Sequence, residues 1–145
     1  MKKIMSILFT TIIIIVIIAY VRYNSYKIEY SNILKENIEY EQYIDKEIYG
    51  IELATIINKT IDKNTNNNVK KDDNGNYVAN EKNSIKIEVY MKDNEKTYIM
   101  ETFYNAGMDQ FIQYYGNIKF KCSKIEYHKS TNRIKYILFE QIITS

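Results

Sequence analysis

The sequence predicts an α+β protein: an N-terminal transmembrane helix continues into a stalk helix, and a short second helix then precedes an antiparallel β-meander with one short inserted helix. Three observations support this prediction. An uncharged apolar run near the N-terminus is long enough to cross a membrane, apolar residues then recur at helical spacing to about residue 63, and alternation typical of strands begins at about residue 85. Helices followed by strands, rather than alternating with them, indicate the α+β class.

The apolar run, residues 4–21, is uncharged, dominated by isoleucine and bounded by Lys2, Lys3 and Arg22. Its 18 residues span roughly 27 Å as a helix, close to the ~30 Å hydrocarbon core of a bilayer. A lone segment in lipid must satisfy its own backbone polar groups, so it is helical even though isoleucine is a mediocre helix former in water. Residues 1–22 are therefore predicted to be a membrane anchor.

A cleaved signal peptide and a buried core helix are the other interpretations of this run. Cleavable signals usually have an apolar region of about 7–15 residues and a site of small residues, which residues 17–19 match poorly. A single-pass anchor in the cell membrane is the favoured interpretation. Lys2 and Lys3 favour a cytoplasmic N-terminus and an extracytoplasmic domain, whereas Arg22 and Lys27 oppose this orientation.

Residues 23–49 are predicted to continue as a stalk helix. Apolar and aromatic residues recur there at alternating spacings of three and four, the pattern of a coiled-coil seam. The seam residues proposed for self-association, as a homo-oligomer, are Tyr30, Ile33, Asn37, Tyr40 and Ile44. Because the seam covers only about three heptads, the favoured interpretation is an amphipathic helix packed on its own domain.

Residues 50–145 are predicted to form one α+β soluble domain. A short amphipathic helix over 51–63 precedes a polar, asparagine-rich segment over 64–83, read as a mobile loop or a weak hairpin in which Asn74 and Gly75 mark a turn. The later elements are recognised by their period: strands over 85–92 and 97–104, a helix over 108–115, and strands over 118–127 and 134–140.

Two details of these strands are predictable. The alternation in the strand over 118–127 slips near 123–124, which indicates a β-bulge. The last strand is apolar on both faces, which is typical of a strand at the centre of a sheet or under a helix.

Composition excludes several partners and sites. Without Lys2 and Lys3, the 20 basic residues become 18 and equal the 18 acidic ones, so no charge excess predicts a nucleic-acid partner. One cysteine forbids an intrachain disulfide, and one cysteine with one histidine cannot supply a zinc site within one chain.

Cys122 and His128, the residues suited to a nucleophile–base pair, lie about 20 Å apart if they share an extended strand. That separation is too long for a catalytic dyad. Cys122 is in phase with Ile118 and Phe120, so a buried side chain is expected. Residues 72–83 lack the glycine and the glutamate that an EF-hand requires at fixed positions. The sequence therefore predicts no enzyme activity, no cofactor and no metal.

Positive charge gathers in the C-terminal hairpin, against Glu126 as the one acidic residue there. Its basic residues are Lys119, Lys121, Lys124, Lys129, Arg133 and Lys135. Such a surface could bind an anionic lipid, polymer or protein. The favoured interpretation is an ordinary solvated face of a sheet.

Three stretches, at residues 50–59 (GIELATIINK), 120–128 (FKCSKIEYH) and 136–141 (YILFEQ), resemble a group of uncharacterised small single-pass membrane proteins of AT-rich Gram-positive anaerobes. In outline the chain is also similar to type IV pilins and pseudopilins, although residues 1–21 lack their processing glycine and their helical glutamate. These resemblances imply a non-enzymatic scaffold or interaction subunit of a cell-envelope assembly. The alternative is an envelope-facing binding module that uses the basic hairpin for an anionic ligand.

Overall fold

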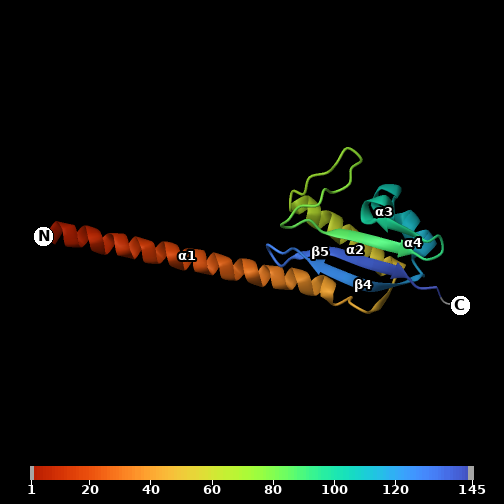
Figure 1. Cartoon of the computed structure of the whole chain (residues 1–145), viewed down its shortest axis with the longest axis horizontal. Helices are drawn as coiled ribbons and strands as arrows, with labels where there is room; N and C mark the ends of the chain where they lie inside the picture. Colours follow the sequence, from red (N-terminus) through yellow and green to blue (C-terminus); the bar gives the residue numbers. More distant parts are fainter. Residues whose placement is uncertain (1, 144–145) are drawn as a thin grey trace. The chain divides into compact units, whose positions relative to one another are not determined.

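The structure is a computed structural model that describes residues 2–143, and the chain divides after Glu36 into two compact units. Helix α1 (Lys2–Glu41) forms all of the described part of the first unit and the beginning of the second (Figure 1). The predicted long N-terminal helix is thus confirmed, but it ends at Glu41 and not at residue 49.

The end of α1 is set by contacts with a distant strand. After Glu41 the chain turns, and Asp45 adopts a left-handed backbone conformation with φ of 58°. The Asp45 N–H donates to the Cys122 carbonyl oxygen at 3.0 Å. Strand β1 (Glu47–Tyr49) then pairs with residues 119–121. The helical spacing of this stretch was misleading because a local pattern does not reveal a strand that pairs far along the chain.

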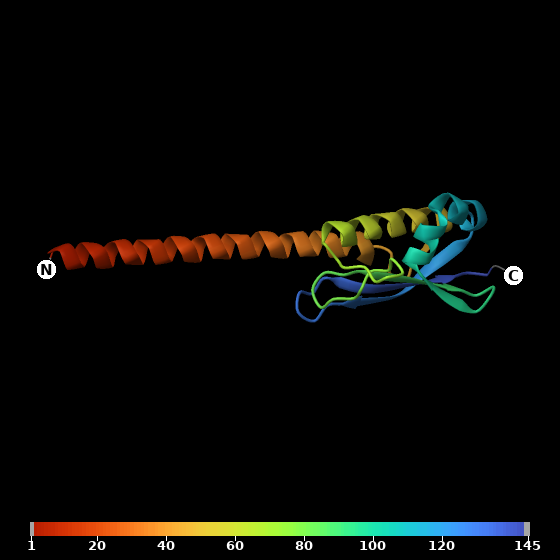
Figure 2. The ribbon, with the colours of Figure 1, turned by 90° about the horizontal axis from the view of Figure 1, so that it is seen from above.

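The second unit is an α+β domain. Its described elements after α1 are β1, α2 (Gly50–Asn66), β2 (Lys86–Met91), β3 (Lys96–Ile99), α3 (Met100–Ala106), α4 (Met108–Tyr115), β4 (Lys119–Tyr127) and β5 (Ile134–Gln141). Figure 2 shows α2, α3 and α4 together on one side of the sheet. The α+β class is therefore confirmed.

The sheet is mixed, and the prediction of an antiparallel meander was wrong. The strand order is β1-β4-β5-β2-β3. All neighbours are antiparallel except β2 and β5, which run parallel. Alternation reports which face of a strand is buried, but it does not report the neighbouring strand or its direction. The central position of β5 agrees with its apolar residues on both faces.

The predicted β-bulge is confirmed. Cys122 pairs with Phe139 and Lys124 pairs with Leu138, so Ser123 is the extra residue in β4. The bulge lets Cys122 before it and Ile125 after it both reach the core.

The segment over 97–104 was predicted as one strand, but it changes from strand to helix. Strand β3 ends at Ile99, and α3 begins at Met100. Gly107, with φ of 102°, separates α3 from α4, so two short helices replace the one that was predicted. Residues Tyr98 to Tyr104 alternate in polarity, which is typical of a strand, but they also include good helix formers such as Met100. Burial of Met100 in the core favours the helix over the strand.

The core fills the space between α2 and the covered face of the sheet. Helix α2 buries Leu53, Ile56, Ile57 and Ile61, which recur at helical spacing. The sheet supplies Ile87, Val89, Met91, Phe120, Ile137 and Phe139. Phe103 of α3 and Phe111 of α4 close one end with ring centroids 4.8 Å apart. In the loop before β2, an isolated bridge between Lys71 and Tyr77 encloses the turn predicted at Asn74 and Gly75.

Candidate functional site

The apolar run of α1 has no polar side. Four consecutive residues, Ile12 to Ile15, have exposed fractions of 42–60%. Consecutive residues are about 100° apart around a helix, so these four isoleucines encircle it. Among the described residues α1 is the one helix long and apolar enough to cross a membrane, and none of its most apolar window is buried. By length and composition it fits a membrane anchor or a signal sequence.

The residues proposed for self-association divide into buried and exposed ones. Tyr30 and Ile44 are exposed, at 51% and 43%. Ile33, Asn37 and Tyr40 are buried. Tyr40 belongs to the same core as Leu53, Ile57 and Phe139, and at Tyr40 the chain therefore packs on its own domain, as the favoured interpretation expected.

Asn37 is bonded within the chain. Its amide Nδ2 donates to the Asn132 carbonyl oxygen at 2.8 Å, and its Oδ1 accepts the Ile134 N–H at 3.0 Å. The side chain thus satisfies two backbone groups where β5 begins. In this arrangement the Asn37 amide is not available to set the register of a second copy.

The six basic residues of the C-terminal hairpin do not form one positive surface. Lys119 pairs with Glu47 at 3.0 Å, and Lys121 pairs with Asp45 at 3.1 Å. Lys124 lies 2.6 Å from Glu126. The acidic partners of the first two come from the β1 region, which no pattern within the hairpin could indicate. The other three are Lys129 and Lys135, which are exposed, and Arg133, which is half-buried.

Cys122 and His128 have separate surroundings. Cys122 is buried in the core, and burial raises the pKa of its thiol to about 11, so the thiol is protonated and a poor nucleophile at neutral pH. His128 is buried, and its Nε2 lies 2.8 Å from the Ser84 carbonyl oxygen. The histidine therefore ties the start of the β4–β5 turn to Ser84, two residues before β2. The described residues contain no group of three metal-ligating side chains.

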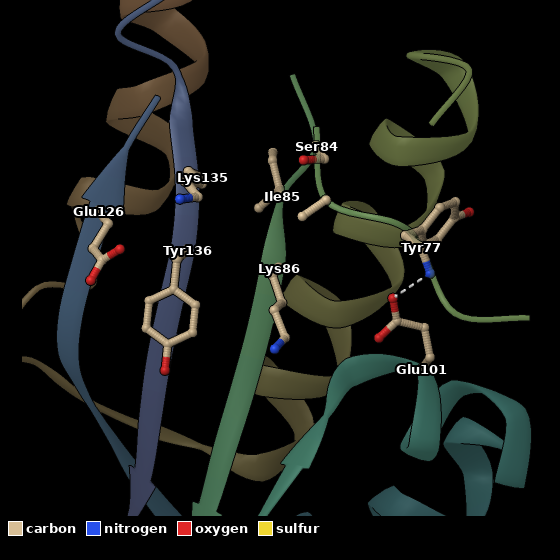
Figure 3. A pocket seen from close by; sticks show the side chains of 9 residues that line it. Tyr77, Ser84, Ile85, Lys86, Glu101, Glu126, Lys135 and Tyr136 are labelled. Carbon is tan, nitrogen blue, oxygen red and sulfur yellow. Dashed lines mark hydrogen bonds between the residues drawn. The ribbon is translucent and has the colours of Figure 1, made fainter. Parts of the chain in front are cut away.

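A pocket beside β2 was not predicted from the sequence. It has a volume of about 180 Å³ and is lined by Tyr77, Ala79, Ser84, Ile85, Lys86, Glu101, Glu126, Lys135 and Tyr136. These residues come from the loop before β2, from β2 itself, from α3, and from β4 and β5 (Figure 3). In Figure 3, Glu101 and Tyr77 stand on one side of β2, and Lys135, Tyr136 and Glu126 stand on the other.

Glu101 is the unusual member of this pocket. The residue is buried, with only 4% of its surface exposed. Its Oε1 accepts the Tyr77 N–H at 3.1 Å. Its Oε2 is, among residues 2–143, the one buried side-chain nitrogen or oxygen atom without a hydrogen-bond partner.

Two other charged residues of the lining, Lys86 and Glu126, have partners of their own. Lys86 lies 2.6 Å from Glu88, and the Tyr136 hydroxyl donates to the same carboxylate at 2.8 Å. Burial opposes ionisation of Glu88, but these two contacts outweigh it and lower its pKa. Glu126 is paired with Lys124. Lys135, also in the lining, is exposed, and its positive charge contributes to lowering the pKa of Glu126. Among the described residues, Glu101 is the lining carboxylate that keeps a buried oxygen without a hydrogen-bond partner.

Sequence reasoning missed Glu101 because it placed this residue on a strand, where it alternates with apolar neighbours and points to solvent. The helix that begins at Met100 turns it inward instead. No local motif marks such a change. Comparison of the chain with protein-family models, with curated proteins and with solved structures found no match.

Proposed function

We propose that this chain is a single-pass membrane protein whose domain serves as a non-enzymatic interaction subunit of a cell-envelope assembly. The observation that supports the anchor most strongly is the exposure of isoleucines all round α1. Burying each large apolar side chain is worth about 1.5–3 kcal/mol, and residues 4–21 do not obtain this within the described chain. A bilayer supplies it to every side of the helix at once.

Two observations support the interaction role. Its cysteine and histidine are buried in separate surroundings, which favours a role without nucleophilic catalysis. The uncovered face of the sheet carries Lys121, Glu140 and Tyr90 side by side, and Glu126, Tyr136 and Lys86 two rows away. Tyrosine is enriched in protein contacts, and charged residues are typical of the polar rim around such a contact.

A pilin-like form of assembly remains a proposal on outline alone. An apolar helix that continues into a polar segment and then a sheet supports it. Residues 1–21 lack the processing glycine and the glutamate of pilins, so assembly would have to proceed without that processing step.

The orientation is testable with the single cysteine. Cys122 is buried, so an impermeant maleimide should not label the wild type. Asn74→Cys places a thiol on an exposed turn. We expect labelling of this variant in intact cells. Labelling only after permeabilisation would place the domain in the cytoplasm and contradict the proposed envelope role.

Self-association is testable on α1. Tyr30 lies on the predicted seam and is 51% exposed, whereas Ile28 lies off the seam and is 63% exposed. In native membranes, Tyr30→Cys should form a disulfide-linked dimer under mild oxidation, and Ile28→Cys should not. Equal cross-linking of both variants, or of neither, would show that the seam does not join copies of the chain.

A further inference from the structure

We propose that the pocket beside β2 binds a primary alkylammonium group, which donates to Oε2 of Glu101. The proposal is independent of the membrane anchor. It rests on two observations: a pocket of about 180 Å³, and a buried carboxylate oxygen on its lining residue Glu101 that has no hydrogen-bond partner among residues 2–143.

The charge of the ligand follows from the carboxylate. A buried carboxylate oxygen without a donor is costly, and a charged donor compensates this best. Oε1 already accepts the Tyr77 N–H. Oε2 is therefore the oxygen that can accept a hydrogen bond from a ligand. Of the two lysines in the lining, Lys86 is engaged with Glu88 at 2.6 Å, and Lys135 stands on the far side of β2 from Glu101 in Figure 3.

The shape of the charged group follows from the same geometry. A guanidinium is planar and is best bound by both oxygens of a carboxylate, whereas an ammonium is a compact point charge. Because Tyr77 occupies Oε1, one oxygen remains for the ligand, and this favours the ammonium. A metal ion would need further ligands, and no group of three such side chains exists among the described residues.

The stem of the ligand follows from the walls. Tyr77, Ala79, Ile85 and Tyr136 line the pocket with ring and methyl carbons, which suit methylene groups. A cavity of about 150 Å³ holds a benzene-sized molecule, so about 180 Å³ accommodates a four-carbon chain that ends in an ammonium. A lysine side chain of a partner protein and a free aliphatic amine both present this chemistry.

The binding can be followed by NMR on the full chain in detergent micelles, with ¹³C-methyl-labelled alanine. Ala79 lines the pocket, and Ala106, which is also exposed, lies at the end of α3 outside it. We expect n-butylammonium to shift the Ala79 methyl signal saturably and to leave Ala106 unchanged. n-Butanol, which has the same stem without the charge, should bind at least about 10-fold more weakly.

Two arms then distinguish the source of the group. Nα-acetyl-lysine amide represents a partner's lysine, and 1,5-diaminopentane represents a free amine. Tighter binding of the first supports a protein partner, and tighter binding of the second supports a small-molecule ligand. Either result supports an alkylammonium site.

The decisive variant is Glu101→Gln, which keeps an oxygen for the Tyr77 N–H and replaces Oε2 by a donor. It should weaken n-butylammonium binding about 10- to 100-fold. Glu95→Gln, on the exposed turn before β3, is the matched control and should bind as the wild type does. If Glu101→Gln fails to fold, the comparison of n-butylammonium with n-butanol on the wild type still tests whether binding depends on the charge of the ligand. No saturable Ala79 shift, equal response to the alcohol, or unchanged binding by a folded Glu101→Gln would each overturn the proposal.

Discussion

The first half of α1 and the whole of α2 are both rich in isoleucine. They differ in where their apolar residues lie, since most of those of α2 are buried and those of the first half of α1 are exposed. Helix α2 gathers Leu53, Ile57 and Ile61 on one face and buries them. Helix α1 has isoleucines on all sides, and none of its most apolar window is buried. The difference lies in the spacing of polar residues. Helix α2 places charged and polar residues between the members of its apolar stripe, whereas residues 4–21 of α1 contain no charged residue, and their Ser6, Thr10 and Thr11 lie near the start. A stripe is suited to a sheet, and a fully apolar helix is suited to lipid.

The largest effect should come from placing the same charge in each helix. Ile57→Asp buries an unpaired carboxylate at a position with no exposed surface, so it should destabilise the domain by at least about 4 kcal/mol and unfold it. Ile13→Asp should leave the melting temperature of the domain unchanged, but should oppose membrane insertion by about 2.5–3.5 kcal/mol. Thermal melts in detergent and membrane fractionation of both variants measure the two effects. A lowered melting temperature for Ile13→Asp would mean that α1 is a core helix.

A smaller but still severe effect should follow where α2 begins. A Cβ atom at Gly50 would lie 1.9 Å from the Tyr115 carbonyl oxygen, so the backbone would have to move. Gly50→Ala should destabilise the domain by about 3 kcal/mol. Gly75→Ala is the control: the loop is open there, and the cost is the strain of φ at +83° alone, about 1 kcal/mol. Urea unfolding of both variants checks the order, and a Gly50→Ala variant as stable as Gly75→Ala would refute the close packing of α2 on α4.

The first part of α1 is exposed, whereas near its C-terminal end α1 buries side chains in the domain. Asn37 is one of these buried side chains. Asn37→Ala leaves the Asn132 carbonyl and the Ile134 N–H without their partner, which should cost about 2 kcal/mol. Asn32→Ala, at an exposed position one turn earlier, should change stability by less than about 0.5 kcal/mol. The two unfolding curves would coincide if Asn37 served only to pair copies of the chain.

The smallest effect concerns pH. Glu39, near the end of α1, has its pKa lowered chiefly by the hydrogen bond from Lys63 at 2.8 Å, and also by Lys59. A lowered pKa in the folded state contributes stability at pH above the unfolded value of about 4.3, and this is lost as pH falls through the folded value. The side chain is 41% exposed, so we expect less than about 1 kcal/mol. Melts from pH 7 to 3 should show a smaller acid loss in Glu39→Gln than in the wild type, and parallel curves would contradict the assignment.

The sequence predicted those features that depend on local pattern. The long N-terminal helix, α2, the bulge at Ser123 and the central place of β5 all follow from spacing within one segment. The features that it missed depend on distant pairing. Strand β1 exists because it pairs with β4, and the parallel contact of β2 with β5 joins strands whose own patterns carry no direction.

The candidate sites divide in the same way. The basic residues of the hairpin were found by composition, but the acids that neutralise Lys119 and Lys121 come from the β1 region. Glu101 has no unusual neighbours in the sequence. Only the change from strand to helix at Met100, together with the loop that brings Tyr77 beside it, encloses the carboxylate.

The measurement that tests the membrane anchor most directly is alkaline carbonate extraction of membranes from cells that express the whole chain, followed by intact-mass analysis. An anchored helix stays in the pellet after extraction, because its apolar residues on every side remain in the hydrocarbon. We predict that the chain is found in the pellet with the mass of all 145 residues. A soluble product that lacks roughly the first 20 residues, the length of a cleaved signal peptide, would contradict the anchor.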